Sequence, residues 1–502
     1  MIEEEVKLAV PGRFALPELT DPDGGVHAVE AAGTRTLRAT YWDTADLRLA
    51  RNGITLRYRT GESGPPWHLK LPLPGHSPGT REELTAKGKV GAVPAELRAL
   101  VTGWVRGAEL APVATLRTVR AVYRVLGPDG TELAELVDDM VSVLDGQRAV
   151  ARFRELEVER RAGAGTVLPR LRDRLVAAGA VEGEFTPKVV RALGPAATQP
   201  SDLPAPPALT GKVTGGDVVA AALATAARGL VRQDAPVRRG APDAVHQMRV
   251  ACRRLRSDLR TFGPLLEAGW ADGLRDELSW LADSLGAARD LEVQRERIRA
   301  AAGADPLAPV DPAATGRIDA LLAGAETAAL AAALATLNTA RYARLLDRVV
   351  DSARQPALTP LAGKPADQAI APLVAAAWQK LTAQAGRLRP GGADQRWHRV
   401  RILAKRARYA GEAAAPAVGR PARKLAAAAE SIQDLLGRHQ DAAVTAQTLL
   451  ELAHRHPDDL ALVLTCGRLA ERERAAVRAS RAAFPAAWER AASPRATRWL
   501  AS

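Results

Sequence analysis

Charged and apolar residues alternate with a period of two from the start of the chain to about residue 192. In residues 2–8, Glu3, Glu5 and Lys7 share one face, which is typical of a β-strand with one polar side. Turn signals, such as the Asn-Gly pair at 52–53, separate several further strand-like segments. These segments are 34–42, 53–60, 67–72, 114–125, 130–139, 139–146 and 151–160. Eight mainly antiparallel strands predict a closed barrel.

Beyond residue 212 the apolar residues recur with the period of helices, for example in 216–233 and 426–456. Between the two patterns lies a segment rich in Pro, Ala and Ser, which predicts an extended linker. The fold-class prediction is a multidomain α+β chain with an antiparallel β-barrel followed by an all-α domain. The predicted ranges are 1–193 for the barrel, 194–211 for the linker and 212–500 for the helical domain.

The helical region contains an internal repeat. Wound as a helix, 243–262 gathers one histidine and four arginines within an arc of about 80°, opposite an apolar face. The spacing of His246, Arg249, Arg253, Arg254 and Arg256 returns at His398, Arg401, Lys405, Arg406 and Arg408. A second match follows each copy, with Leu285, Gly286, Arg289 and Asp290 in the first and Leu436, Gly437 and Asp441 in the second. The repeat predicts two pseudo-symmetric helical bundles, about 212–350 and 365–500, related by a twofold axis.

Charge and composition narrow the class of partner. The formal net charge is +13 and the isoelectric point is about 10.2, so we expect nucleic acid, an anionic membrane surface or a polyanionic small molecule. Two cysteines support neither a disulfide framework nor a zinc site, which indicates a reducing compartment. We find neither a signal-peptide pattern nor an uninterrupted run of 18 apolar residues. The predicted location is the cytoplasm, with no membrane partner, and association with polyphosphate granules is left open.

Each repeat thus carries a basic stripe, the helix face formed by its histidine and its arginines or lysine. Such a stripe fits a linear chain of phosphates better than it fits nucleic acid. The stripes hold almost no aromatic or amide side chains that would stack on bases or read base edges. A lone histidine is more often a core or capping residue, but the duplication of His246 and His398 within matching arginine patterns favours contact with an anion. Asp243 and Asp394 are expected as N-caps, so that free N–H groups also face the anion. For Arg289 and Asp290 a structural ion pair is favoured.

In the predicted barrel, one face of several strands is charged. Arg57, Arg59 and Lys70 alternate with apolar residues, and so do the glutamates of 155–159. A single strand of this kind would be an ordinary solvent-facing strand, whereas several together favour a polar lumen. Such a lumen would bind an anion through Arg and Lys and a divalent metal through carboxylates. The sequence has no Walker A loop, HExxH helix or dinucleotide fingerprint.

These residues resemble the CYTH superfamily, the triphosphate tunnel metalloenzymes, over about residues 1–192. The resemblance rests on Glu3-x-Glu5-x-Lys7, on 41–44 and 49–51, on Leu56-Arg57-Tyr58-Arg59 and on the late acidic strands. It implies a tunnel that clamps a triphosphate and holds Mg²⁺ or Mn²⁺. The implied catalytic residues are Glu3, Glu5 and Lys7, and the implied metal ligands are Glu3, Glu5, Glu155 and Glu157. The implied triphosphate-binding residues are Lys7, Arg57, Arg59, Lys70, Arg120 and Lys188. Whether Glu159 or Arg117 replaces its neighbour is left open.

The helical region resembles the CHAD domain, a conserved-histidine α-helical domain, over about residues 212–497. The repeated histidine–arginine motifs carry this resemblance, and a CYTH domain followed by a CHAD domain is a recurring order. It implies binding of inorganic polyphosphate in a basic groove between the bundles. The implied ligands are His246, Arg249, Arg253, Arg256, Arg260, His398, Arg401, Lys405, Arg406 and Arg408.

The resulting functional prediction is a metal-dependent triphosphatase whose helical domain binds polyphosphate. Hydrolysis of a phosphoanhydride needs neutralised phosphoryl oxygens and an oriented water molecule, which basic residues and metal-binding carboxylates supply. Two alternatives stay open: a non-catalytic polyphosphate-binding protein and, less favoured, a nucleic-acid-binding protein. Inorganic triphosphate, a nucleoside triphosphate and thiamine triphosphate present the same three phosphates, so the sequence does not choose among them.

Overall fold

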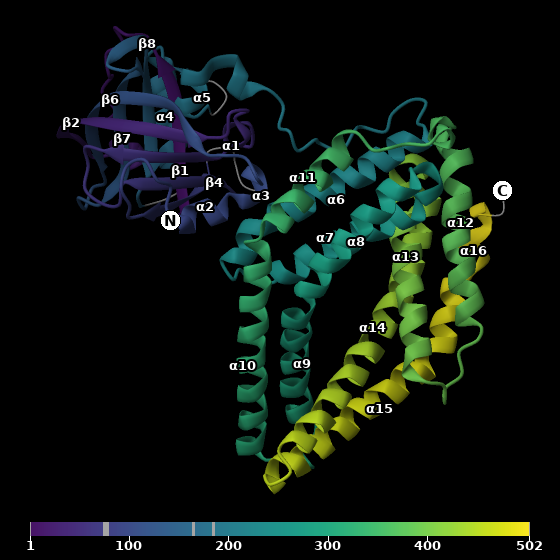
Figure 1. Cartoon of the computed structure of the whole chain (residues 1–502). Helices are drawn as coiled ribbons and strands as arrows, with labels where there is room; N and C mark the ends of the chain where they lie inside the picture. The colour runs from purple at the N-terminus through teal and green to yellow at the C-terminus, as the bar shows by residue number, and fades with distance from the viewer. Residues whose placement is uncertain (1, 74–79, 163–165, 183–185, 501–502) are drawn as a thin grey trace. The chain divides into compact units, whose positions relative to one another are not determined.

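The computed structural model describes residues 2–73, 80–162, 166–182 and 186–500 (Figure 1). The chain divides into two compact units, Met1–Asp202 and Leu203–Ser502. The division lies within the range that the sequence assigns to the linker. The first part of that range is not extended, because Gly194–Thr198 form a 3₁₀ helix and Asp202 forms an ion pair with Arg106.

Among the described residues of the first unit, eight antiparallel strands close a barrel, which confirms the predicted fold class. The strands follow one another around the barrel in the order β1-β5-β4-β3-β2-β6-β7-β8, and β1 joins β8 to β5. A short ninth strand, β9, also pairs with β1. The strands are β1 (Ile2–Val10), β2 (Ala28–Asp43), β3 (Thr55–Thr60), β4 (Trp67–Pro72), β5 (Thr80–Ala86), β6 (Ala111–Leu126), β7 (Glu132–Asp145), β8 (Arg148–Arg160) and β9 (Val181–Glu182).

The prediction of the strands was wrong in two details. The segments 130–139 and 139–146 form one continuous strand, β7, instead of two. The strand β5 was not predicted, because its residues TREELTA lack a regular alternation. Merging the first two segments and adding β5 leaves the number of barrel strands at eight.

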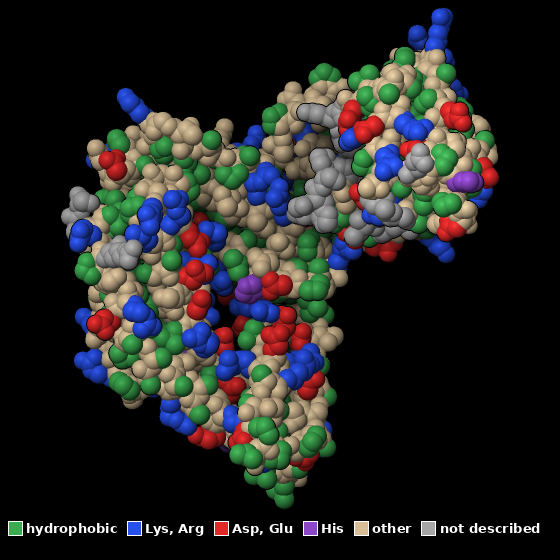
Figure 2. Space-filling view, turned by 180° about the vertical axis from the view of Figure 1, so that it is seen from behind, with side chains coloured by type: hydrophobic (Ala, Val, Ile, Leu, Met, Phe, Trp, Pro, Cys, Tyr) green, Lys and Arg blue, Asp and Glu red, His purple; other side chains and the backbone are tan. Residues whose placement is uncertain are grey.

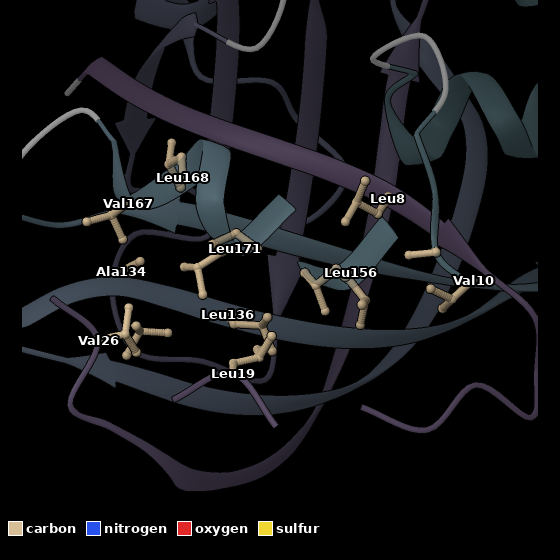
Figure 3. Packing of buried hydrophobic residues seen from close by; sticks show 14 of the residues in the cluster. Leu8, Val10, Leu19, Val26, Ala134, Leu136, Leu156, Val167, Leu168 and Leu171 are labelled. Atoms are coloured by element: carbon tan, nitrogen blue, oxygen red, sulfur yellow. The ribbon is translucent and has the colours of Figure 1, made fainter. Parts of the chain in front are cut away.

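Apolar side chains cover the outside of the barrel. In α4 (Val167–Ala177), Leu168 and Leu171 lie in a buried cluster with Leu8 of β1 and Leu156 of β8 (Figure 3). A second cluster covers β3 and β4 with the short helices α1 (Arg48–Arg51), α2 (Ala95–Leu100) and α3 (Thr102–Val105). Because the hydrophobic cores lie outside the sheet, the interior of the barrel is free to hold polar residues.

One end of the lumen is filled by α5 (Lys188–Leu193). Its Val189 and Val190 pack with the inward-facing Tyr41 and Val141. This contact places the first residue of the helix, Lys188, in the interior of the barrel. The helix therefore both seals the apolar end and delivers a cation to the polar part.

The second unit consists of helices that fall into two halves. The first half holds α6 (Gly215–Arg238), α7 (Ala244–Thr261), α8 (Ala268–Ser284), α9 (Gly286–Gly303), α10 (Pro312–Leu337) and α11 (Ala340–Arg354). The second holds α12 (Ala366–Ala385), α13 (Asp394–Val418), α14 (Arg420–Arg455), α15 (Leu460–Ala491) and the short α16 (Pro494–Thr497). The helices α14 and α15 run side by side along most of their length (Figure 1).

The two halves begin with the same order of helices, although the first half divides into more helices than the second among the described residues. The pair α6 and α7 corresponds to α12 and α13, and α7 packs against α13 between the halves. Leu285-Gly286 separates α8 from α9, whereas the matching Leu436-Gly437 lies inside the continuous helix α14. The repeat seen in the sequence is therefore a repeat of structure, with a helix break in the first copy alone.

The helix α10 is long and apolar enough to cross a membrane when length and composition alone are considered. The sequence prediction, which required 18 consecutive apolar residues, passed over it because Arg317, Asp319 and Glu326 interrupt the run. In the structure α10 packs against α9, where Arg295 donates hydrogen bonds to both Asp319 and Glu326.

Candidate functional site

The barrel encloses a polar cavity of about 390 Å³. Nine basic side chains line it, together with six glutamates, among the residues that the structure describes. All six cations that the sequence assigns to a triphosphate are among them: Lys7, Arg57, Arg59, Lys70, Arg120 and Lys188. They come from β1, β3, β4, β6 and α5, so only the closed barrel brings them together.

Lys188 lies at the centre of a buried ion-pair network. Its Nζ is 2.9 Å from Asp139, 2.8 Å from Glu155 and 2.7 Å from Glu157. Arg120 donates two hydrogen bonds to Asp139, at 2.8 and 2.6 Å, and one to Glu157 at 3.1 Å. Burial by itself would raise the pKa of Glu157, but Lys188, Lys7 and Arg120 hold that pKa well below its ordinary value. The network is therefore ionised and internally neutralised.

The opposite wall of the cavity is held together around Glu83 of β5. The Nδ1 of His68 lies 2.9 Å from this carboxylate, and Arg57 and Lys70 lie 3.6 and 3.9 Å from it. Arg59 forms an ion pair with Glu62, and burial lowers the pKa of Arg59 to about 10. This wall holds four basic side chains in place with two carboxylates.

Three glutamates form a row across adjacent strands. Glu5 of β1 is the direct neighbour of Glu159 of β8, which in turn is the neighbour of Glu135 of β7. Burial raises the pKa of Glu159, and Glu5 and Glu135 add to this shift while Arg161 opposes it. Like charges directly opposite one another destabilise a sheet, so a bound cation would stabilise this row. Arg161 lies 2.9 Å from Glu159 and 3.2 Å from Glu135.

The row has the oxygen donors that Mg²⁺ and Mn²⁺ prefer. Among the described residues no three His, Cys, Asp or Glu side chains are gathered tightly enough to form a metal site by themselves. Mg²⁺ is commonly held by one or two carboxylates together with phosphate oxygens of a substrate, and Glu5 and Glu159 fit that arrangement. The side chain of Glu3 lies outside the described residues.

The helical unit holds a basic groove made of two adjoining pockets. The pocket that we call the histidine pocket has about 300 Å³ and is lined by both repeats, with His246 and Arg249 of α7 opposite His398 and Arg401 of α13. The arginine pocket, of about 260 Å³, lies between α7, α8 and α13. The two pockets share Arg253, His398, Arg401 and Lys405. Figure 2 shows basic and histidine side chains at a hollow of the helical unit.

The groove contains little negative charge. Among the residues described, nine basic side chains but only two carboxylates line the pockets. Asp290 accepts a hydrogen bond of 2.9 Å from Arg249, and in the other half Asp441 lies 3.9 Å from Arg401. Burial lowers the pKa of Lys405 to about 6, and the neighbouring Arg401 and Arg253 add to this effect. Burial also lowers the pKa values of His246 and His398.

Comparisons with known proteins agree with the two-domain organisation. A CYTH domain model matches residues 1–178, and a CHAD domain model matches residues 221–450. The chain is also 36% identical to the uncharacterized protein Rv2226 of Mycobacterium tuberculosis over 457 residues, which cover 85% of this chain and 84% of the relative. The chain is a CYTH–CHAD protein.

Two solved structures resemble the helical part. PptA from Streptomyces chartreusis is 28% identical, with a TM-score of 0.47, and the match covers 55% of this chain and 99% of that one. The CHAD domain from the plant Ricinus communis is also 28% identical, with a TM-score of 0.44, and covers 56% and 96%. The CYTH family is metal-dependent and includes triphosphatases and adenylyl cyclases.

Some predicted residues lie elsewhere than expected in the CYTH domain. Glu155 is buried beneath the cavity, where it pairs with Lys188 and Arg191, so its position argues against a role as metal ligand. Glu157 lines the cavity but is bound to three cations. Glu159, which the sequence left as an alternative, lies in the carboxylate row. Arg117 is exposed outside the barrel, on the face opposite Arg120.

The CHAD groove also corrects four expectations. Arg408 does not line either pocket, because it pairs with Glu412 at 2.7 Å and Glu430 at 2.9 Å. Asp243 stands at the N-cap position of α7 with φ of 61°, but its side chain makes no cap hydrogen bond. Asp394 is the first residue of α13 instead of its cap, and it binds Arg474 at 2.8 Å. Arg289, expected to pair with Asp290, pairs with Glu292 instead.

Several cavity residues were not found from the sequence. Arg35 shares the inward face of β2 with Tyr41, a signal that the strand pattern contains. Arg81 and Glu83 lie on the strand that was not predicted. In the CHAD domain, Arg275 of α8 joins the arginine pocket from outside the histidine–arginine motif.

Proposed function

We propose that the CYTH barrel hydrolyses inorganic triphosphate, or a related short polyphosphate, in a reaction that depends on Mg²⁺ or Mn²⁺. The observation that carries this proposal is the single cavity in which all six predicted cations face the row of Glu5 and Glu159. The excess of basic groups over carboxylates suits a ligand with several negative charges, and its phosphoryl oxygens can accept from Lys and Arg.

The cavity residues would have different roles in this reaction. Lys7, Arg57 and Arg120 bind and orient the phosphoryl oxygens, and their positive charge stabilises the negative charge that grows in the transition state. Glu5 and Glu159 would hold the metal ion, which when bound polarises the phosphoryl group and lowers the pKa of water. Water attacks the terminal phosphorus, the bond to the bridging oxygen breaks, and pyrophosphate leaves with the electron pair of that bond while the attacked group becomes orthophosphate. A carboxylate of the row would accept the proton of the water.

The test is phosphate release by the purified full chain from tripolyphosphate, ATP and thiamine triphosphate, each with Mg²⁺, Mn²⁺ or EDTA. We expect metal-dependent release that is fastest from tripolyphosphate. Arg57→Ala should lower the rate strongly, while Arg117→Ala, an arginine outside the barrel, should not. Cyclic AMP as the main product from ATP, or no turnover of any substrate, would contradict the proposal.

We infer further that the CHAD groove binds inorganic polyphosphate. The supporting observation is that two repeats direct nine basic side chains, with only two carboxylates among the described residues, at one continuous groove. A flexible linear polyanion can follow such a groove, and its binding should weaken steeply with salt as counterions are released. Competition between labelled long-chain polyphosphate and an oligonucleotide at fixed salt tests this choice. Displacement of polyphosphate by an equal charge of oligonucleotide would favour a nucleic-acid site.

A further inference from the structure

One charge difference between the two repeats lies just beyond the histidine pocket. With a constant offset along α7 and α13, Arg254 corresponds to Arg406 and Arg256 to Arg408. One helical turn later, Arg260 of the first half corresponds to Glu412 of the second. At the same distance from each histidine, the first half therefore has a positive charge where the second half has a negative one.

In the second half, this difference removes a cation from the groove. Arg408 is tied to Glu412 on its own helix and to Glu430 on α14. Glu412 also pairs with Arg254 across the halves. On this side of the groove the basic side chains are neutralised, so a polyanion would meet carboxylates.

In the first half, the matching place is almost purely basic. Arg256 and Arg260 line the arginine pocket together with Arg406 and Arg275, and of these only Arg275 has an ion-pair partner, Asp272, among the described residues. Burial lowers the pKa of Arg406, and Arg260, Arg275 and Arg256 lower it further, as expected for cations that repel one another. Such a cluster is stabilised when an anion binds.

The arginine pocket is also the continuation of the histidine pocket, because Arg253, His398, Arg401 and Lys405 line both. We propose that polyphosphate leaves the histidine pocket in one direction only, through the arginine pocket between α7, α8 and α13. This pocket then supplies the affinity for chains too long for the histidine pocket, and so makes binding depend on chain length. The inference rests on the proposed polyphosphate binding by the CHAD domain.

The sharpest test transplants the residue of the second half into the first. In Arg260→Glu, the new carboxylate lies one turn from Arg256, as Glu412 lies one turn from Arg408, and should neutralise it. Ile402→Glu places a carboxylate in the same pocket from α13 without removing an arginine. Arg408→Gln is the control, because it removes the matching arginine from the side that we expect to be unused.

The measurement is the affinity of the full chain for polyphosphates of graded length at several salt concentrations. For long chains, Arg260→Glu should weaken binding about tenfold at low salt and reduce the salt slope by about 1 to 1.5, because roughly two phosphate contacts are lost. Its affinity should stop rising at a shorter chain length than that of the wild type. Ile402→Glu should show the same change in direction, and Arg408→Gln should stay within about twofold of the wild type.

The possible failures are distinguishable. If the wild-type chain does not retain polyphosphate, the proposed CHAD function is wrong and this inference fails with it. If the wild type binds but Arg260→Glu and Ile402→Glu both bind long chains as tightly as the wild type does, only the proposed direction of the path is wrong. The same conclusion follows if Arg408→Gln weakens binding as much as they do. Unchanged circular dichroism and unchanged triphosphate hydrolysis show that each variant is folded.

Discussion

The barrel cavity and the helical groove are each lined by nine basic side chains, but six carboxylates line the first and two line the second, among the residues described. In the barrel, Lys188 touches three carboxylates and Lys7 lies 2.5 Å from Glu157. In the groove, Lys405 has no ion-pair partner among the described residues, and its pKa falls to about 6. Lys188 and Lys7 of the barrel thus have carboxylate partners before any ligand binds, whereas Lys405 of the groove has none among the described residues.

This difference matches two kinds of task. If the barrel hydrolyses triphosphate as proposed, it must release its product, and its carboxylates would restore the pairing of its cations when the product leaves. A site that retains a polyanion gains from cations that repel one another until the ligand binds, because the relief of that repulsion adds to the affinity. The comparison predicts opposite responses when a central lysine is removed from each site.

The largest effect is expected in the barrel. Replacing Lys188 by Met leaves Asp139, Glu155 and Glu157 close together with fewer cations, and the loss of a buried partner typically costs about 3–5 kcal/mol. We expect a loss of this size in the free energy of unfolding of the barrel, measured by urea denaturation. Lys70→Met, which removes a lysine 3.9 Å from its carboxylate, is the matched control and should change the stability much less. Equal stability of the two variants would remove the contrast between the sites.

A second prediction separates the two roles of the glutamates in β8. Glu159→Gln should lower the rate of triphosphate hydrolysis by about 10²–10³-fold while the stability changes little, because the row loses a metal-binding oxygen. Glu155→Gln should instead lower the stability, since Arg191 loses its carboxylate partner and Lys188 loses one of its three. Rates measured at saturating Mn²⁺ and melting temperatures provide the comparison. A catalytic loss confined to Glu155→Gln would restore the ligand set expected from the sequence.

A third prediction concerns the groove. Lys405→Met should raise the free energy of unfolding of the helical unit by about 1–2 kcal/mol, because a half-buried polar amine without an ion-pair partner among the described residues is replaced by an apolar side chain. The same change should weaken polyphosphate binding. Thermal unfolding without ligand and affinity at fixed salt show whether stability and binding move in opposite directions. A destabilised variant would mean that Lys405 is satisfied in the free protein.

The sequence predicted the barrel because most of its strands alternate between apolar and charged residues. It divided β7 at Asp139, where one predicted strand ended and the next began. In the structure Asp138 and Asp139 point to opposite faces, where Arg154 binds Asp138 and Arg120 binds Asp139. Two adjacent acidic residues within a strand need partners from other strands, and a single sequence does not show them.

The sequence predicted the site residues that belong to a repeated motif. It did not predict the residues whose position depends on ion pairs with other elements. Strand alternation indicated Arg57, Arg59 and Lys70. The resemblance to the CYTH superfamily implied Lys7, Arg120 and Lys188, and most of the groove followed from helix spacing. The buried place of Glu155 did not, because it depends on Lys188 and Arg191 of a different element. Asp258 is similar, because its almost complete burial, which raises its pKa to about 8, arises from tertiary packing.

The smallest expected effect is the uptake of a proton by Lys405 when polyphosphate binds. Because the folded pKa of Lys405 is about 6 and lies below that of the unfolded chain, the unfolded state binds more protons between these values, so stability should rise with pH in this window. Burial lowers this pKa, and the neighbouring Arg401, Arg253 and Arg249 lower it further, while Asp441 raises it. A bound polyphosphate adds negative charge beside Lys405 and should return the pKa toward its ordinary value.

Binding at pH 8 should therefore take up a fraction of a proton, at most about one per groove. Titration calorimetry in two buffers of different ionisation enthalpy measures this uptake. At this pH the lowered pKa values of His246 and His398 keep both histidines largely neutral, which limits their share. Lys405→Arg keeps the positive charge at every pH, so it should bind polyphosphate without the uptake. Equal uptake by the variant would assign the proton to the histidines, and the contrast between the paired lysine of the barrel and the unpaired lysine of the groove would lose its clearest signature.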